Sequence, residues 1–395
     1  MADQDLTLAG VDFLVTESAQ EALCWLAEEN LSPEQHLRLI SRLRQTFSLQ
    51  ESGWLLDQAR LRQKAIDKFE HAEDCLFLDE ALQQASSLPL SKYHAEQLKD
   101  YLHVADLGAG IGADSIAMAK AGCHVTAVEL DPVRAKLLQH NAKVSGVEHQ
   151  ITIFQTDWTR VTLKVDAAFI DPARRTDGKR VFTLDAMIPP ISAIQELWTK
   201  IPNLLVKVAP GIDHTEMPAN VEVEFVSLHG EMKEALLRFG GLHQGLARCA
   251  TLLPSGVQLT AESEADPELE IGEARAYLFE PDPAIIRARL VRPLGEMLNA
   301  GMLNPDIAYL SADAAVDTPF ARCWQVLRQG GFHLKTLNQW LRELEAGEVV
   351  IKKRGSPIDP DTFRKRLKTT PDGRKLTVFF TICQDKPWMV VASLR

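Results

Sequence analysis

The chain has 395 residues, of which 46% are hydrophobic and 25% charged, and its formal net charge is −11. This length predicts two or three domains that can each bury a core, and no apolar run approaches the roughly 18 residues that a membrane span needs. The first ten residues are acidic where a secretory signal would be basic. Six scattered cysteines without a C-x-x-C pair argue against a disulfide framework and a zinc site. We therefore expect a cytoplasmic protein with no metal, no membrane and no obligate protein partner.

Three regions follow one another along the chain. Residues 13–101 show apolar positions at helical spacing, which predicts an N-terminal helical domain over 1–101. Residues 102–260 alternate apolar strands with helical patterns, which predicts an α/β domain with a parallel sheet. We expect its strands at 103–107, 124–130, 151–156, 166–170, 204–209, 221–228 and 247–253.

The acidic stretch "TAESEADPELEIGEA" indicates that a linker opens the third region. Residues 261–323 are predicted to hold this linker and a helical connection, with a helix over 283–300. Residues 324–395 are predicted to form a small α/β unit. Its elements are a helix over 334–346, a strand over 349–354, a helix over 360–367, and two strands over 376–383 and 388–393.

The stretch "DLGAGIGADS", residues 106–115, joins the first expected strand to a helix-forming run. Such a glycine-rich turn lets the backbone approach a ligand closely, and Glu129 ends the next strand, where an acidic side chain can bind ribose hydroxyls. A dinucleotide or S-adenosylmethionine would suit this arrangement. Ala113 occupies the place of the third glycine in the dinucleotide fingerprint, and Asp106 would crowd a pyrophosphate but suits an ammonium group. The residues therefore favour S-adenosylmethionine.

Four ordered motifs, "VADLGAGIG", "VTAVELD", "FQTDW" and "AAFIDPARR", resemble those of the class I methyltransferases. The resemblance implies a Rossmann-like, seven-stranded sheet that binds S-adenosylmethionine. It also implies roles at the methionine end, the ribose and the adenine. The residues that it assigns to the cofactor are Asp106, Gly108, Ala109, Gly110, Glu129, Leu130, Asp157 and Trp158.

Further segments, among them "LRQKAIDKF", "YLFEPDPAIIRARLV" and "IKKRGSPIDPDTFRKRL", are similar to a bacterial family of class I methyltransferases that end in a THUMP-like domain. THUMP domains belong to RNA-modifying enzymes, so this resemblance implies an RNA substrate, tRNA or rRNA.

The fourth motif predicts the chemistry of transfer. Asp171 and Pro172 match the start of the [DN]-P-P-[FYW] pattern found in many enzymes that methylate an exocyclic amine, but Ala173 and Arg174 replace its second half. Arg174 and Arg175 can stack on a base or bind a phosphate, or they can pair with surface carboxylates. We expect catalytic roles for Asp171, Pro172 and Arg174, and a substrate contact from Arg175. No cysteine lies near this motif, so we predict direct, in-line transfer to a nitrogen or an oxygen rather than covalent catalysis. Of these two acceptors we favour a nitrogen of a base in structured RNA.

The acidic chain contains one basic window, residues 352–375, with nine basic and three acidic residues. We predict that it binds RNA through Lys352, Lys353, Arg354, Arg364, Lys365 and Lys368, unless it is only a solvated surface. Two other functions stay open: a methyltransferase for a small molecule or a protein, and an RNA-binding protein whose methyltransferase fold no longer catalyses. The intact Asp106, Glu129, Asp157 and Asp171 argue against the last.

Overall fold

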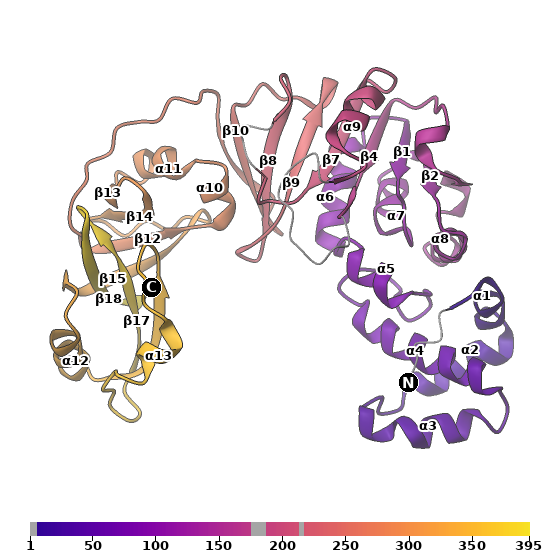
Figure 1. Cartoon of the computed structure of the whole chain (residues 1–395), viewed down its shortest axis with the longest axis horizontal. Coiled ribbons are helices and arrows are strands. Elements are labelled where there is room, and N and C mark those ends of the chain that lie inside the picture. Colours follow the sequence, from indigo (N-terminus) through magenta and orange to yellow (C-terminus); the bar gives the residue numbers. More distant parts are fainter. Residues whose placement is uncertain (1–5, 175–186, 213–216) are drawn as a thin grey trace. The chain divides into compact units, whose positions relative to one another are not determined.

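The computed structural model describes residues 6–174, 187–212 and 217–395, and the chain divides into two compact units. The first comprises Met1–Val221 with Leu237–His243, and the second comprises Glu222–Leu236 with Gln244–Arg395. Figure 1 labels the helices and strands of both units. Within the described ranges, no helix combines the length and the apolar character needed to cross a bilayer.

The first unit begins with short helices, as the apolar spacing predicted. They are α1 (Leu8–Leu14), α2 (Glu17–Ala27), η1 (Pro33–Gln35), α3 (His36–Leu43), α4 (Leu49–Lys64), α5 (Asp79–Gln84) and α6 (Leu88–Leu98). Several begin at polar caps: Thr16 accepts from the amide of Ala19, and Ser48 and Glu51 form a reciprocal capping box. Such caps satisfy amide groups that the first turn of a helix leaves unpaired.

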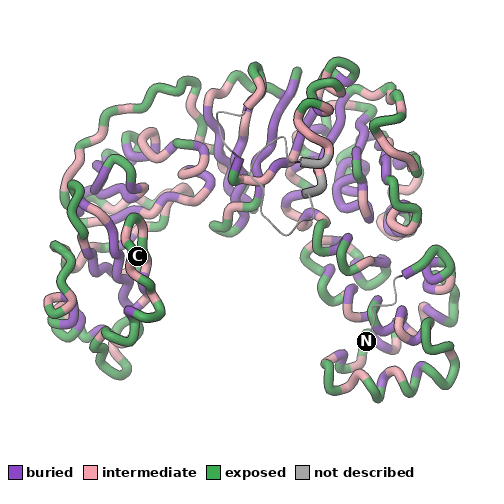
Figure 2. Tube along the Cα trace, in the orientation of Figure 1, coloured by how far each residue is buried: buried purple, intermediate pink, exposed green. Residues whose placement is uncertain are grey.

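A parallel sheet follows, and each of the strands predicted within residues 102–260 agrees with the structure to within one residue at both ends. The elements in chain order are β1 (His103–Leu107), α7 (Ala113–Lys120), β2 (His124–Glu129), α8 (Pro132–Val144), η2 (Glu148–Gln150), β3 (Ile151–Gln155), η3 (Trp158–Arg160), β4 (Ala167–Ile170), α9 (Ile191–Trp198) and β7 (Asn203–Val208). Their strands lie in the order β7-β4-β1-β2-β3, with parallel pairing throughout. The central strands are buried over most of their length (Figure 2).

The register of these strands determines which residues meet at the edge of the sheet where the parallel strands end. Leu107 of β1 pairs with Ile170 of β4, and Ile170 pairs with Val206 of β7. The residues that come next along the three strands are Gly108, Asp171 and Lys207. Parallel register therefore gathers the glycine loop, the fourth motif and a lysine at one edge, where ligands bind in open α/β sheets.

The α/β fold is confirmed, but this sheet has nine strands in the described part of the chain rather than the predicted seven. The remaining strands are β8 (Glu222–Leu228), β9 (Glu231–Phe239), β10 (Arg248–Leu253) and β11 (Val257–Ala261). The hydrogen-bonded order is β11-β10-β8-β9-β7-β4-β1-β2-β3. A separate two-stranded ribbon pairs β5 (Ala173–Arg174) with β6 (Met187–Ile188).

The second unit contains a further sheet of seven strands. Its elements are β12 (Tyr277–Pro281), α10 (Pro283–Arg287), α11 (Val291–Met297), β13 (Gly301–Asn304), β14 (Ile307–Ala312), β15 (Ala321–Gly331), α12 (Leu334–Glu343), β16 (Ala346–Lys353), α13 (Pro360–Arg364), β17 (Arg374–Cys383) and β18 (Lys386–Leu394). The strand order is β13-β14-β12-β15-β18-β17-β16. The helix predicted over 283–300 is two helices, because Arg289 adopts a positive φ of 57° between them.

Both faces of this second sheet carry a core. Phe380 of β17 packs with α12 and α13 on one face, and its neighbour Phe379 packs with Tyr309 and Trp324 on the other. Successive strand residues point to opposite faces, so one apolar strand serves two cores. The basic window therefore folds around a packed centre.

Candidate functional site

The glycine loop between β1 and α7 is held close to β2. The amides of Gly108 and Ala109 donate to the Val128 carbonyl, at 2.9 and 3.1 Å. Gly110 has a positive φ of 57°, and a Cβ built on it would meet no atom within 4 Å. The backbone of this loop is thus open on the side where a side chain would otherwise stand, as close approach to a ligand requires.

Glu129, at the end of β2, is buried to 7% exposure and its carboxylate faces this loop. Its Oε2 accepts from the Gly110 amide and its Oε1 from the Asp131 amide, each at 2.8 Å. A carboxylate oxygen can accept more than one hydrogen bond. Glu129 can therefore hold the loop and still accept hydrogens from a ligand hydroxyl.

Asp106 is almost fully buried, and its carboxyl group accepts a hydrogen bond from Ser115 at the start of α7. Burial, together with the nearby carboxylate of Asp114, raises the pKa of Asp106 to about 8. The charges of Asp171 and Glu129 act in the same direction. This end of the site is therefore rich in carboxyl groups, and a cation placed there would stabilise their ionised forms.

Asp157, Trp158 and Leu130 follow the ends of β3 and β2. Asp157 caps η3 by accepting from the amide and the hydroxyl of Thr159, at 2.9 and 2.8 Å, and these bonds hold its pKa below the usual value. Trp158 is half-buried, whereas Leu130 is 67% exposed. An ionised acceptor thus lies beside apolar surface, which suits a flat heterocycle with an amino group.

Asp171 follows β4, and its side chain is 35% exposed. Its backbone oxygen lies 4.0 Å from a Cβ built on Gly108, so the fourth motif adjoins the glycine loop. Lys207 Nζ donates to Asp171 Oδ2 at 2.6 Å. The predicted acceptor group and the predicted cofactor loop therefore share one edge of the sheet.

Several polar residues at this edge had no assigned role in the sequence: Ser86, His94, Asp114 and Ser115. Asp114 and Ser115 stand in the glycine motif itself, but Ser86 and His94 precede it without any recognisable pattern. Ser86 Oγ donates to Asp114 Oδ2 at 2.9 Å, and His94 Nδ1 lies 2.7 Å from Asp114 Oδ1. The N-terminal helices therefore contribute buried polar groups directly beside the motif residues.

The two arginines predicted to contact substrate, Arg174 and Arg175, lie at the boundary of a described range. The backbone of Pro172 and Arg174 is described, but the Arg174 side chain is not, and Arg175 lies outside the described residues. Their roles stay predictions.

The predicted RNA-binding residues fall into two groups in the second unit. Lys352 pairs with Glu280 and lies 5.0 Å from the centre of the Trp324 ring. Arg354 donates to the Ala308 carbonyl and stacks over Tyr309. Lys353, Arg364, Lys365 and Lys368 are exposed, although Arg364 also donates to the Val349 carbonyl at 2.8 Å. Internal contacts thus engage three of the six side chains, Lys352, Arg354 and Arg364.

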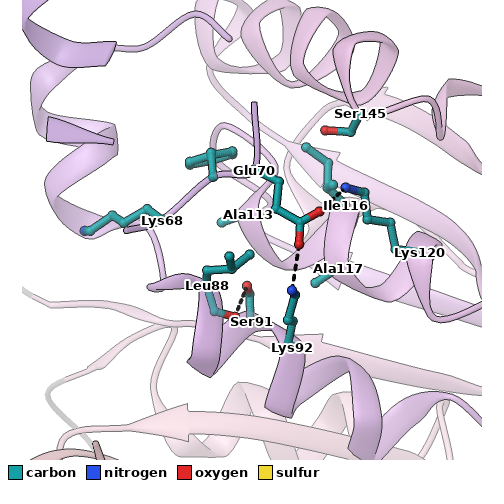
Figure 3. A pocket seen from close by; sticks show the side chains of 11 residues that line it. Lys68, Glu70, Leu88, Ser91, Lys92, Ala113, Ile116, Ala117, Lys120 and Ser145 are labelled. Carbon is teal, nitrogen blue, oxygen red and sulfur yellow. Dashed lines mark hydrogen bonds and ion pairs between the residues drawn. The ribbon is translucent and has the colours of Figure 1, made fainter. Parts of the chain in front are cut away.

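A pocket of the first unit lies between the N-terminal helices and α7 (Figure 3). At its centre, Glu70 forms ion pairs with Lys92 and Lys120, each at 2.6 Å. Hydrogen bonds from Lys120 and Lys92 lower the pKa of Glu70 to about 2. No residue predicted to bind the cofactor lines this pocket. These ion pairs connect the N-terminal helices to α7. The pocket therefore lies at a packing interface within the first unit and not at the predicted cofactor site.

The hydrogen-bond acceptors at the sheet edge fit S-adenosylmethionine. This cofactor offers them three groups with hydrogens to donate: an ammonium group, a ribose diol and an adenine amino group. Carboxyl groups lie at three successive places, beside a loop with open backbone. Among the described residues no group of His, Cys, Asp or Glu side chains could hold a metal ion.

The chain is similar to known proteins in sequence and in fold. Residues 102–177 match the family model described as RNA cap guanine-N2 methyltransferase, and residues 321–394 match the model described as THUMP domain-like. An uncharacterised S-adenosylmethionine-dependent methyltransferase of Mycobacterium tuberculosis, found in the CDC 1551 and H37Rv strains, is 34% identical over 340 residues. This match covers 83% of the present chain and 92% of the relative.

A solved structure shares the fold over nearly the whole chain. It is a protein of Porphyromonas gingivalis W83, described provisionally as a methyltransferase, with a TM-score of 0.78 and 20% identity. The similarity covers 96% of this chain and 98% of that one. The present chain therefore belongs to the S-adenosylmethionine-dependent methyltransferases that carry a C-terminal THUMP-like domain.

Proposed function

We propose that this enzyme methylates a nitrogen atom of a base in structured RNA, tRNA or rRNA, by direct in-line transfer. The observation that carries the proposal is the position of Asp171, a partly exposed carboxylate beside Gly108 of the cofactor loop. An acceptor amine that donates to this carboxylate would lie against the loop with its lone pair directed toward the methyl group. Such orientation accounts for much of the rate in two-substrate reactions.

Each predicted cofactor residue has a distinct part in this proposal. Bound S-adenosylmethionine supplies an electrophilic methyl group on a positively charged sulfur. Asp106 provides a carboxyl group near the ammonium, Glu129 accepts from the ribose hydroxyls, and Asp157 accepts from the adenine amine. Backbone groups of Gly108, Ala109 and Gly110 border the methionine end, while Leu130 and Trp158 flank the adenine.

After transfer to nitrogen, the acceptor loses one proton, and Asp171 is the group placed to receive it. A carboxylate at this position needs no metal and no covalent intermediate on the enzyme. Pro172 restricts the backbone directly after Asp171. The roles of Arg174 and Arg175, stacking on the base or binding a phosphate, belong to this proposal as well.

Two similarities support RNA as the acceptor: the guanine-N2 methyltransferase model over the catalytic motifs and the THUMP domain-like model over the C-terminal unit. Exposed Lys353, Arg364, Lys365 and Lys368 would contact the RNA backbone in that unit. The scattered free cysteines are in keeping with a cytoplasmic enzyme.

Methyl transfer in vitro tests the acceptor class. The purified protein, tritiated S-adenosylmethionine and total RNA plus protein from a strain that lacks the gene are incubated together. We expect label that ribonuclease releases and protease does not. Label found only in protein or in small molecules would refute the RNA proposal.

A further inference from the structure

Lys207 stands beside Asp171 because of the strand register. Ile170, the last residue of β4, pairs with Val206 of β7. The next residue of β7 is Lys207, and the residue that follows β4 is Asp171. The Lys207 side chain is 19% exposed, and its Nζ lies 2.6 Å from Asp171 Oδ2. At this distance, with limited water access, the pair is a charge-assisted hydrogen bond.

A buried chain of contacts holds Lys207 from its other side. Its Nζ also lies 3.5 Å from Ser86 Oγ, which donates to Asp114 at 2.9 Å, and Asp114 contacts His94 at 2.7 Å. The His94 ring stacks on Phe169 of β4, with ring centres 4.7 Å apart. Since Phe169 precedes Asp171 by two residues, the contacts form a closed ring that begins on β4, at Phe169, and ends at Asp171, directly after β4.

The charges around this ring explain why a cation is needed there. Three carboxyl groups lie close together here: Asp106 on β1, Asp114 on α7 and Asp171 after β4. Besides burial, the charges of Asp114 and Asp171 raise the pKa of Asp106, and Glu129 at the end of β2 makes a smaller contribution. Burial raises the pKa of Asp114, but the hydrogen bond to His94 of α6 and the positive charge of Lys207 lower it, and the lowering prevails. Lys68, after α4, also lies within electrostatic range of Lys207, and its Nζ is bonded to the carbonyls of Leu82, Gln83 and Ala85.

We propose that Lys207 is a positioning residue for methyl transfer, whose ammonium group fixes the orientation and the charge of the Asp171 carboxylate. This inference rests on the proposed function, in which Asp171 accepts a hydrogen bond from the acceptor nitrogen and then its proton. The ring connects Lys207 to Ser86 and, through Asp114, to His94. The N-terminal helical region therefore helps to position Lys207 in the transfer site.

Rate measurements provide the first test. Lys207→Met removes the charge at similar volume, Lys207→Arg retains it, and Lys200→Met is the control that removes a lysine from an exposed pair with Glu196. We expect Lys207→Met to lower kcat by about 100-fold, the effect of misplacing a reacting group, while the Kd for S-adenosylmethionine changes less than about twofold. Lys207→Arg should restore part of kcat, and Lys200→Met should match the wild type.

The second test needs no acceptor. Carboxyl carbons of aspartate are labelled with ¹³C, the Asp171 signal is identified by its loss in Asp171→Asn, and its titration is followed by NMR. We expect the Asp171 midpoint to rise by about one pH unit or more in Lys207→Met, and to return toward the wild-type value in Lys207→Arg. If Lys207→Met does not fold, Lys207→Gln replaces it in both tests.

The two tests separate this inference from the proposed function. If the wild type labels no RNA, the acceptor proposal is wrong, and the Asp171 titration still decides the role of Lys207. An unchanged Asp171 midpoint without the lysine charge, or a wild-type kcat in the uncharged variant, would overturn the positioning role.

Discussion

The amide nitrogen of Gly110 lies 2.8 Å from Oε2 of Glu129, so one buried carboxylate joins the glycine loop to the end of β2. Glu129→Ala should therefore weaken S-adenosylmethionine binding in two ways, by removing the ribose acceptor and by releasing the loop. A charge-assisted hydrogen bond contributes about 1.5 to 3 kcal/mol, which corresponds to roughly 10- to 150-fold in Kd. Isothermal titration calorimetry measures this loss directly.

Two comparisons control this prediction. Glu148→Ala removes a carboxylate from η2, outside the predicted site, and should leave the Kd unchanged. The wild type should give no calorimetric response to NAD. Tight NAD binding without a response to S-adenosylmethionine would contradict the assignment of the loop.

Asp171→Ala should abolish methyl transfer and leave cofactor affinity nearly unchanged, because the side chain is assigned to the acceptor. Steady-state rates and equilibrium binding of S-adenosylmethionine, measured on the same preparation, test the two parts separately. Turnover near the parent rate would exclude Asp171 from the reaction.

The raised pKa of Asp106 predicts an unusual dependence of stability on pH. Its pKa is about 8 in the folded protein against 3.8 for an unperturbed side chain. Between these values the folded state retains a proton that the unfolded chain has lost, so this contribution to stability is present at low pH and is lost as pH rises through about 8. Without cofactor, the thermal midpoint should fall more steeply from pH 5 to pH 8 in the wild type than in Asp106→Asn. Parallel curves for the two proteins would show that Asp106 does not carry this proton.

The exposed lysines of the second unit predict the salt dependence of RNA binding. Single-stranded RNA affinity falls by about 0.7 log unit per log unit of salt for each phosphate neutralised. Replacing Lys353, Lys365 and Lys368 together by alanine should therefore reduce this slope by about two units. The Kd for S-adenosylmethionine should not change.

A charge-matched control is the triple alanine variant of Lys335, Lys375 and Lys386, three exposed lysines outside the predicted set. It should keep the wild-type slope if position matters. Equal slopes in all three proteins would show that the predicted residues are only a solvated surface.

Strands with a simple apolar pattern could be predicted from the sequence, whereas others could not. β4 is buried at every position, and such continuous apolar runs identify the strands of a parallel sheet. β15 has only one fully buried residue among its 11, so neither alternation nor a continuous apolar run marks it. Its pairing with β12 and β18 comes from tertiary contacts that the local pattern does not encode.

The motif residues of the candidate site stand in recognisable sequence patterns, whereas the polar groups that contact them do not. Asp106 lies next to the end of β1, Glu129 lies at the end of β2, and Asp171 directly follows β4. The parallel register brings these strand ends together. Ser86 and His94 come from a helical region with no motif, and only the fold places them against Asp114. Likewise, the internal contacts of Lys352 and Arg354 depend on Glu280 and Tyr309, far away in the sequence.

Nucleoside analysis of cellular RNA tests the central claim most directly. Total RNA from cells with and without the gene is digested and compared by mass spectrometry, with complementation by the wild type and by Asp171→Asn. We predict that one N-methylated nucleoside disappears without the gene, returns with the wild-type protein and does not return with the variant. An identical set of methylated nucleosides in all four RNA samples would contradict the assignment of this enzyme to RNA.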